Sequence, residues 1–197
     1  EGSQKRLLRA LLNVRPPMPV SAEFLSLQDE YLTERKYEHG IADVKNLVYS
    51  DGISLLKGDI TTLNADAIVN AANSAMLGCF RPLHNCIDNA IHTFAGVQVR
   101  LDCNDIMKGR EAENGEVVVT KAYNLPSKFI FHTVGPVVYG RVTKENEADL
   151  AKCYLNCLTK ADEMKLKSIA FCCISTGVFG YPKEEAALLA VKVVREY

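Results

Sequence analysis

Residues 78–86, with the sequence GCFRPLHNC, place two cysteines and a histidine within nine residues. Thiolates and imidazole are ligands that zinc prefers in proteins, and catalytic zinc sites use three protein ligands and keep a fourth position open. From these residues alone the segment can be a metal site, a reactive thiol, or a loop with buried sulfurs. The rest of the sequence has to separate these interpretations.

Asp59, Asn70 and Asn73 offer hydrogen-bonding groups beside expected strands. The Asp59 carboxylate can accept hydrogen bonds from an exocyclic amine such as that of adenine, or it can cap the turn that follows it. Asn70 and Asn73 flank two alanines, whose small side chains let a ligand approach closely. Their amides can bind sugar hydroxyls, and each asparagine can equally be a turn residue.

Asp88 and residues 175–182 (STGVFGYP) have features of anion-binding segments. Gly177 and Gly180 let the backbone adopt positive φ and approach a ligand, and successive N–H groups in such a turn form a concave anion site. An ordinary turn between a strand and a helix is the alternative. Asp88 falls in the first turn of an expected helix, where the dipole favours a carboxylate and free N–H groups can also bind an anion.

The remaining cysteines and most of the histidines have positions typical of a protein core. Thiols are among the most frequently buried side chains, and a histidine inside a strand or helix is more often hydrogen-bonded within the fold than a ligand. His92 also lies one helical turn after Asp88. We expect structural roles for Cys153, Cys157, Cys172, Cys173, His92 and His132.

Strands alternate with helices from about residue 46, which predicts an α/β fold with a largely parallel sheet. Ligands of such folds bind beyond the carboxyl ends of strands, where the segments above lie. Helical apolar spacing over 3–13, and a second helix from Ser21 to a stop at Gly40, predict a helical extension at 1–45 before a domain at 46–197. Strands are expected at 53–60, 66–73, 116–123, 128–135 and 168–175, and helices at 86–96, 97–109, 145–164 and 183–197.

The composition favours one compact, cytoplasmic domain with a small appendage. The chain has 197 residues, of which 48% are hydrophobic, enough for a substantial core. Lys and Arg total 23 against 24 Asp and Glu, so nothing in the net charge of -1 favours nucleic-acid or membrane binding. There is no transmembrane-length apolar run and no signal-peptide pattern. Seven cysteines, an odd number, do not form a secreted disulfide framework.

Four motifs in order, KGDITTLNADAIVNAANSAMLG, IDNAIHTFAG, HTVGP and STGVFGYPKEEAA, resemble the macrodomain family of ADP-ribose binders and hydrolases over residues 52–197. Hydrolytic macrodomains ordinarily have a glycine-rich loop after NAAN. The segment CFRPLHNC in its place resembles the microbial zinc-containing branch, whose members remove ADP-ribose from proteins. The resemblance implies a three-layer α/β/α fold with a mixed, largely parallel sheet and a helical N-terminal extension. It also implies a further strand and helix, so we expect a sequence truncated at its C-terminus.

The resemblance assigns a role to each matching residue. Asp59 would bind the adenine amine beside the Ile60 backbone, and Asn73 would contact the distal ribose. One zinc ion per chain would be held by Cys79, His84 and Cys86. The pyrophosphate and distal ribose would lie against Cys86, Ile87 and Asp88. The second phosphate loop would comprise Ser175, Thr176, Gly177, Val178 and Phe179.

These roles lead to an expected reaction. Two thiolates cancel the formal charge of Zn²⁺, so the ion would be a weaker Lewis acid than in a three-histidine site and would mainly orient a ribose hydroxyl. Asn73 would fix the ribose and Asp88 would activate or position water. The bond between C1″ of ADP-ribose and an acidic side chain of a mono-ADP-ribosylated protein would be cleaved. A non-catalytic ADP-ribose reader is the main alternative, and structural zinc with another nucleotide ligand is a third.

The resemblance also implies partners. They are a sirtuin-type ADP-ribosyltransferase and a lipoylated carrier protein, neither of which is indicated by any single residue of the chain.

Overall fold

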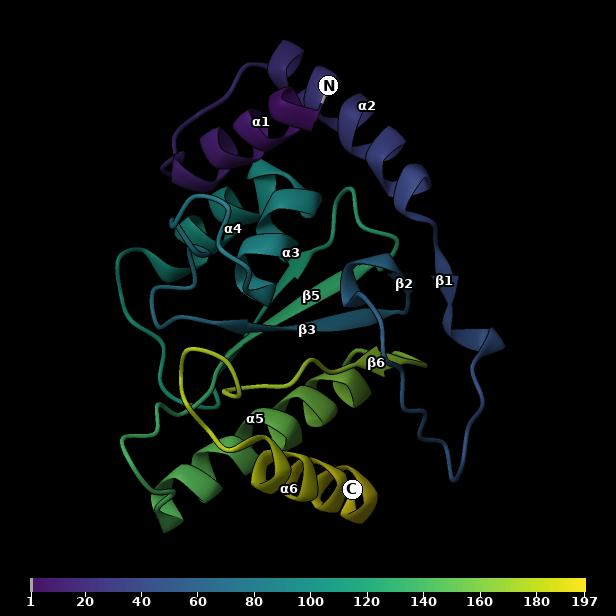
Figure 1. Cartoon of the computed structure of the whole chain (residues 1–197), viewed down its shortest axis with the longest axis vertical. Helices are drawn as coiled ribbons and strands as arrows, with labels where there is room; N and C mark the ends of the chain where they lie inside the picture. Colours follow the sequence, from purple (N-terminus) through teal and green to yellow (C-terminus); the bar gives the residue numbers. More distant parts are fainter. Residues whose placement is uncertain (1) are drawn as a thin grey trace.

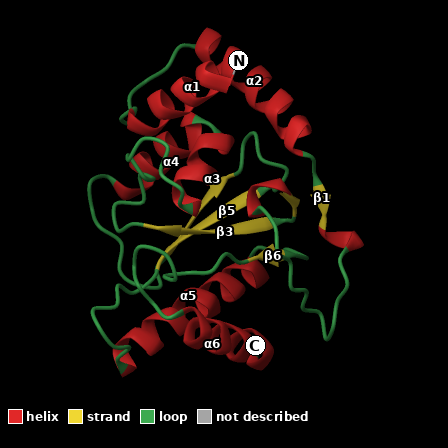
Figure 2. Cartoon of the chain, viewed as in Figure 1, coloured by secondary structure: helices red, strands yellow, loops and turns green. Residues whose placement is uncertain are grey.

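The computed structural model describes residues 2–197 and has three layers, with one β-sheet between two groups of helices (Figures 1 and 2). The strand order of this sheet is β4-β5-β3-β6. β3 pairs in parallel with β5 and β6, whereas β4 pairs antiparallel with β5. The expected mixed, largely parallel sheet is therefore confirmed. Its strands are β3 (Ala67–Ala72), β4 (Val117–Lys121), β5 (Phe129–Val134) and β6 (Ile169–Ala170).

Helices cover both faces of the sheet (Figure 1). α3 (Ile87–Ala95) and α4 (Val97–Met107) lie on one face, with α1 (Gly2–Val14) and α2 (Ala22–His39) outside them. α5 (Lys144–Glu163) and α6 (Lys183–Glu196) lie on the other face. None of the helices in residues 2–197 has the length and hydrophobicity that a membrane span requires.

Alternating side chains of the central strands build the core on both faces, because successive strand residues point to opposite sides. Ile68 and Ile130 pair in register and pack in the cluster that includes α3 and α4. Val69 and Phe131, the next pair, pack in the cluster that includes α5 and α6. All four side chains are fully buried. Cys153 and Cys157 of α5 are also fully buried, as expected for core residues.

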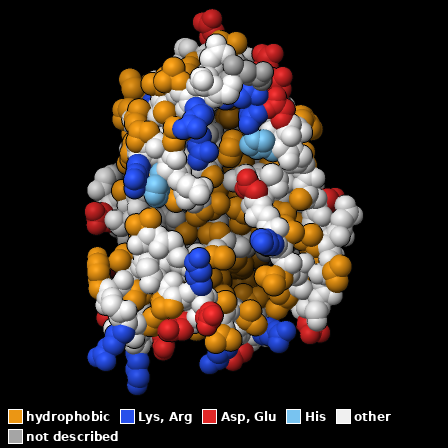
Figure 3. Space-filling model, viewed as in Figure 1, with side chains coloured by type: hydrophobic (Ala, Val, Ile, Leu, Met, Phe, Trp, Pro, Cys, Tyr) orange, Lys and Arg blue, Asp and Glu red, His pale blue; other side chains and the backbone are white. Residues whose placement is uncertain are grey.

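The helical N-terminal segment forms as predicted. Ser21 caps α2 by accepting a hydrogen bond at Oγ from Phe24 N at 3.1 Å, and the helix ends at Gly40, whose φ of 81° suits glycine. The chain then forms a two-stranded parallel ladder of β1 (Ala42–Asp43) with β2 (Leu63–Asn64). The chain between these two strands begins with the short 3₁₀ helix η1 (Val44–Asn46) and ends with η2 (Ile60–Thr62). On the face in Figure 3, side chains of both charge signs are interspersed.

Two expected strands are wrong in extent. In the segment 53–60 only Ile53 pairs, through an isolated bridge to Ser50, and Leu55 is 100% exposed. This apolar run lies beside no strand in the described chain, and a strand needs a neighbour for its backbone groups. The segment 168–175 forms only the two residues of β6. The chain then leaves the ladder in a turn, so Cys173 is exposed rather than buried.

Candidate functional site

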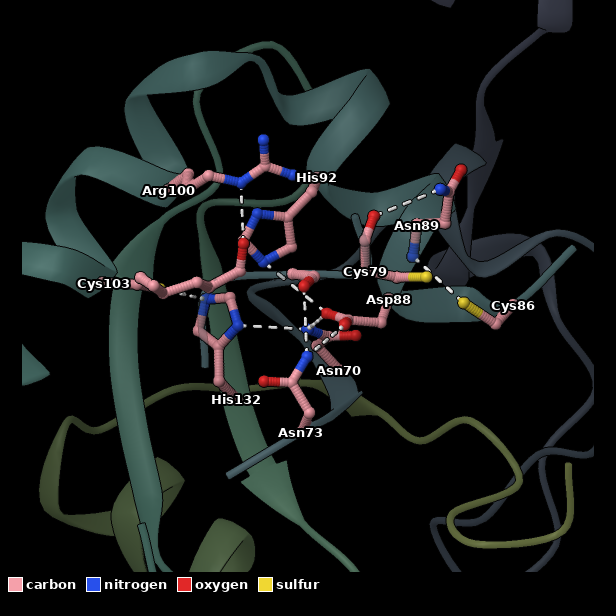
Figure 4. A network of polar contacts seen from close by, with 12 residues as sticks. Asn70, Asn73, Cys79, Cys86, Asp88, Asn89, His92, Arg100, Cys103 and His132 are labelled. Carbon is pink, nitrogen blue, oxygen red and sulfur yellow. Dashed lines mark hydrogen bonds and ion pairs between the residues drawn. The ribbon is translucent and has the colours of Figure 1, made fainter. Parts of the chain in front are cut away.

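Asp88 is the centre of a buried polar cluster at the start of α3 (Figure 4). Asn70 and His132 pair in register across β3 and β5, on the side of the sheet that faces α3. Asn70 Nδ2 donates to Asp88 Oδ1 at 2.8 Å, and Asn73 Nδ2 donates to Asp88 Oδ2 at 3.3 Å. Asp88 is only 5% exposed. The structure therefore brings together the two predicted catalytic residues, Asn73 and Asp88.

The electrostatics of Asp88 follow from this burial. Burial raises the pKa of Asp88 to about 6, against the hydrogen bonds from Asn70 and Asn73 and the positive charge of Arg100. Each carboxylate oxygen accepts one amide hydrogen bond, which leaves each oxygen able to accept another. The arrangement can orient a water molecule or a hydroxyl group of a ligand.

His92 lies beneath this cluster and explains why residue 78 is glycine. His92 Nε2 is 3.6 Å from Asp88 Oδ1, and within residues 2–197 neither ring nitrogen has a hydrogen-bond partner. Burial lowers the pKa of His92, and His132 and Arg100 lower it further, so the ring is neutral. A Cβ on Gly78 would lie 2.7 Å from the His92 ring, so the loop can pass over the imidazole only at a glycine. The expectation of a hydrogen-bonded His92 is wrong.

His132, in contrast, is a hydrogen-bonded structural residue as expected. Its Nδ1 lies 3.1 Å from Asn70 Nδ2, and its Nε2 lies 3.0 Å from Thr120 Oγ1. Burial lowers the pKa of His132 to about 3. Together with His92 and Cys103 it forms a buried group of metal-ligand type. Because both His132 nitrogens already have partners in the core, this group is part of the packing around Asp88.

Cys79, His84 and Cys86 converge as the sequence predicts. Their ligand atoms all lie within 4.8 Å of one another, and Cys79 Sγ is 3.5 Å from His84 Nδ1. Zinc bonds of about 2.3 Å to sulfur and about 2.0 Å to nitrogen, at a tetrahedral angle, separate the two ligand atoms by about 3.5 Å. The chemistry and the spacing of the donor set therefore fit a zinc ion.

Cys86 links this donor set to helix α3. Its Sγ accepts a hydrogen bond from Asn89 N at 3.4 Å and so caps the helix, two residues before Asp88 in the first turn. Burial raises the pKa of Cys86 to about 11, and the nearby Cys79 and Asp88 raise it as well. The Cys86 thiol in these surroundings becomes a thiolate readily only beside a cation, because the positive charge favours the ionised form.

The predicted phosphate loop lies between β6 and α6. Ser175 has a φ of 62°, and its buried Oγ has no hydrogen-bond partner in residues 2–197. The loop is closed by hydrogen bonds from Gly180 N to Gly177 O at 3.1 Å and from Tyr181 N to Ser175 O at 3.0 Å. The N–H groups of Gly177, Val178 and Phe179 donate to no acceptor in this part of the chain. Consecutive free N–H groups are suited to an anion.

Ser175 also lies against the loop that follows β5. A Cβ added at Gly135 would clash with the Ser175 side chain, so HTVGP and STGVFG pack directly on one another. Both segments follow strands that run parallel, at the same edge of the sheet as Asn73. The Thr176 hydroxyl is used within the loop, because its Oγ1 donates to Cys173 O at 2.9 Å.

Asp59 and Ile60 lie at the start of η2, beside α3. Asp59 Oδ1 accepts hydrogen bonds from Thr61 N at 2.9 Å and from Thr61 Oγ1 at 2.7 Å, so the turn-capping role occurs. Oδ2 remains available to a ligand. Ile60 packs against the cluster that contains Ile91 of α3. Within residues 2–197 the hydrogen bonds of Asp59 stay within its own turn, so the structure does not join it to the Asp88 cluster.

The fold and site define a three-layer α/β/α domain with a polar cluster, and with a loop of free N–H groups, at the carboxyl edge of its parallel strands. The profile of the Macro domain family matches residues 69–190, and the chain belongs to that family. A protein-ADP-ribose hydrolase of Staphylococcus aureus (strain MRSA252) is 54% identical over 196 residues, covering 97% of this chain and 73% of that protein.

Solved macrodomain structures are similar as well. An Oceanobacillus iheyensis macrodomain with ADP is 42% identical, with a TM-score of 0.65, over 71% of this chain and 73% of that one. A Trypanosoma brucei macrodomain in complex with ADP-ribose is 32% identical, with a TM-score of 0.69, over 91% of this chain and 79% of that one. These structural similarities show that the three-layer fold described above is the macrodomain fold.

Three residues have roles around Asp88 that the sequence did not indicate. Asn70 holds Asp88, His92 supports the Gly78 turn, and Arg100 places its charge near Asp88. The position of Asn70 could have been predicted, because it lies two residues after Ile68 in the strand and therefore points to the same face of the sheet, toward the helix that carries Asp88. Arg100 had no such signal, since its partners are backbone carbonyls of remote segments.

Proposed function

We propose that this chain is a zinc-dependent hydrolase that releases ADP-ribose from mono-ADP-ribosylated acidic side chains. The chain is a protein-ADP-ribose hydrolase by its relationship to the S. aureus protein. The observation that carries the zinc dependence is the convergence of Cys79, His84 and Cys86, with a sulfur-to-nitrogen distance of 3.5 Å. That convergence occurs two residues before the buried carboxylate of Asp88.

Zinc held by Cys79, His84 and Cys86 would act as a weak Lewis acid that binds and orients a hydroxyl of the distal ribose. The protein residues would do the rest. Asn73 Nδ2 already donates to Gly78 O at 3.1 Å and to Asp88, so its amide is fixed and its oxygen can accept from the ribose. The sugar would then lie between the loop at Gly78 and the start of α3.

Asp88 would hold the attacking water. Its two oxygens are fixed by Asn70 and Asn73, and the lone pairs that remain can accept from water without movement of the side chain. The C1″–O bond to the acidic side chain breaks, the hydroxyl of water adds to C1″, and the side chain leaves as a carboxylate with release of a proton. Free ADP-ribose and an unmodified protein are the products.

The nucleotide part of the substrate would extend along the carboxyl edge of the sheet. Its pyrophosphate would bind the free N–H groups of residues 177–179, with Ile87 and Ser175 beside it. The adenine amine would reach Asp59 Oδ2. We also propose that the reaction is cytoplasmic. The family resemblance suggests a sirtuin-type ADP-ribosyltransferase and a lipoylated carrier protein as partners.

The test is the release of ADP-ribose from a protein modified on glutamate and aspartate. Cys79→Ala should lower both the zinc content and the turnover, whereas Asp88→Ala should retain one zinc per chain and lose turnover by about 100-fold or more, the usual effect of removing an acid-base group. Cys173→Ser is the matched control, because Cys173 is an exposed thiol outside the donor set. Normal turnover by Asp88→Ala would refute its assignment.

A further inference from the structure

We propose that helix α1 positions the metal-binding loop, residues 79–86, through Asn13 and Arg9. This inference rests on the proposed zinc site and assigns a role to the N-terminal extension. Within residues 2–197, α1 lies against α3, and its side chains form hydrogen bonds with the loop that carries the donor set. Asn13 and Arg9 would not bind the ion themselves; they would hold the loop whose residues bind it.

Asn13 is a buried connector between α1, the loop and α3. Its side chain is 1% exposed, although asparagine is usually found at the surface. Oδ1 accepts a hydrogen bond from Leu83 N at 2.9 Å, and Nδ2 donates to Thr93 Oγ1 at 2.9 Å. Thr93 in turn donates to Asn89 O at 2.7 Å. Asn13 thus ties the loop to the helix that Cys86 caps.

The backbone at Leu83 shows what this hydrogen bond holds. Leu83 has a φ of 55°, a left-handed conformation that is unfavourable for a residue with a side chain. It directly precedes the ligand His84. If Leu83 relaxed to negative φ, the direction of the chain into His84 would change, and the imidazole would leave the two sulfurs. The hydrogen bond from Leu83 N to Asn13 stabilises the conformation that keeps them together.

Arg9 reaches the same loop from one helical turn earlier. Its Nη2 donates to Asn89 Oδ1 at 2.8 Å and to His84 O at 3.4 Å. Asn89 then contacts both cysteines of the donor set: its Nδ2 donates to Cys79 O at 3.4 Å, and its backbone N donates to Cys86 Sγ at 3.4 Å. Arg9 and Asn89 together therefore touch all three predicted ligand residues.

A third contact fixes α1 itself. Buried Arg100 of α4 donates to Leu12 O at 3.0 Å and to Arg15 O, at the C-terminal end of α1, where the helix dipole favours a cation. Its Nε donates to Leu77 O at 2.7 Å, and its guanidinium lies 4.4 Å from the centre of the Phe80 ring. The same side chain thus holds the end of α1 and the beginning of the loop.

These contacts pre-organise the donor set. Ligand residues that are already fixed lose little conformational entropy when a metal binds, so the affinity rises. The hydrogen-bonding partners of metal ligands typically contribute 10- to 100-fold to metal affinity. We therefore expect Arg9→Ala and Asn13→Ala each to weaken zinc binding by about 10-fold or more.

The experiment measures the zinc dissociation constant by competition with a chromophoric chelator, together with the melting temperature of the zinc-free protein. Arg6→Ala is the matched control, because Arg6 lies on α1, is exposed, and lies outside the contacts described above. Its zinc affinity should stay within about twofold of wild type, well below the usual effect of a ligand-supporting residue. Arg9→Ala should differ from Arg6→Ala in zinc affinity more than in zinc-free melting temperature.

The outcomes are distinguishable. If the wild-type protein binds no zinc, the proposed function fails. If it binds zinc and Arg9→Ala binds equally tightly, the role of α1 is overturned while the zinc site stands. The role of α1 is also overturned if the variants lower the melting temperature of the zinc-free protein but leave the zinc affinity of the folded protein unchanged. Should Asn13→Ala not fold, the half-buried Arg9 still decides the question.

Discussion

Replacing Asn70 by alanine should cost both stability and turnover. Asn70 is fully buried and donates to Asp88 Oδ1 at 2.8 Å, with His132 Nδ1 at 3.1 Å from the same nitrogen. Asn70→Ala leaves both acceptors without that donor. A hydrogen bond to a charged group contributes about 1.5–3 kcal/mol and a neutral one about 1 kcal/mol, so we expect a loss of about 3 kcal/mol. For a chain of 197 residues this corresponds to about 6–12 °C in melting temperature.

The assay is urea unfolding combined with turnover measured below the melting temperature. Asn156→Ala is the control, because Asn156 donates to Gly115 O at 2.8 Å from an exposed position and should cost less than about 1.5 kcal/mol. The folded Asn70→Ala protein should still bind zinc but should turn over slowly, since Asp88 loses its orientation. A loss below about 1 kcal/mol with normal turnover would refute the reasoning that Asn70 positions Asp88.

Two further predictions concern Gly78, beside the site, and Asp66, at the opposite end of β3. Gly78→Ala should lower the free energy of unfolding by about 2 kcal/mol or more, since its Cβ would lie 2.7 Å from the His92 ring at a φ of 80°. Gly109→Ala is the control, because Gly109 has a φ of 79° and a Cβ there would meet no atom within 4 Å. Its free energy of unfolding should fall only by the cost of the left-handed backbone. If urea unfolding gave the same loss for both variants, the steric argument would be contradicted. The Lys128 ammonium, 2.6 Å away, lowers the pKa of Asp66, so this carboxylate stabilises the fold above its unfolded pKa and loses that effect as pH falls through the folded one. Asp66→Asn should therefore be less stable than wild type at neutral pH and equal to it in strong acid, and a pH-independent difference would contradict this.

Much of the fold could be predicted where a local pattern is long and regular. The apolar period of residues 145–164 and the nearly unbroken apolar run of 128–135 correspond to α5 and β5. Ser21 and Gly40 marked the ends of α2 through local capping chemistry. Helix α3 was also predictable, and with it the placement of Asp88 in a first turn.

Features that depend on remote partners could not be predicted in the same way. The apolar run at 53–60 looks like a strand, but pairing requires a neighbour that no local pattern reveals. Asn70 and His132 are 62 residues apart and meet only because β3 and β5 pair in one register. Asn13 lies 70 residues before Leu83, so the hydrogen bond between α1 and the metal-binding loop could not be predicted from the sequence.

The most direct test of the central claim is the release of ADP-ribose by this protein with and without zinc. The substrate is a protein that carries mono-ADP-ribose on glutamate or aspartate. We predict turnover with one zinc per chain, loss of turnover after removal of zinc by a chelator, and recovery when zinc is added back. Full turnover by the metal-free protein would contradict the account.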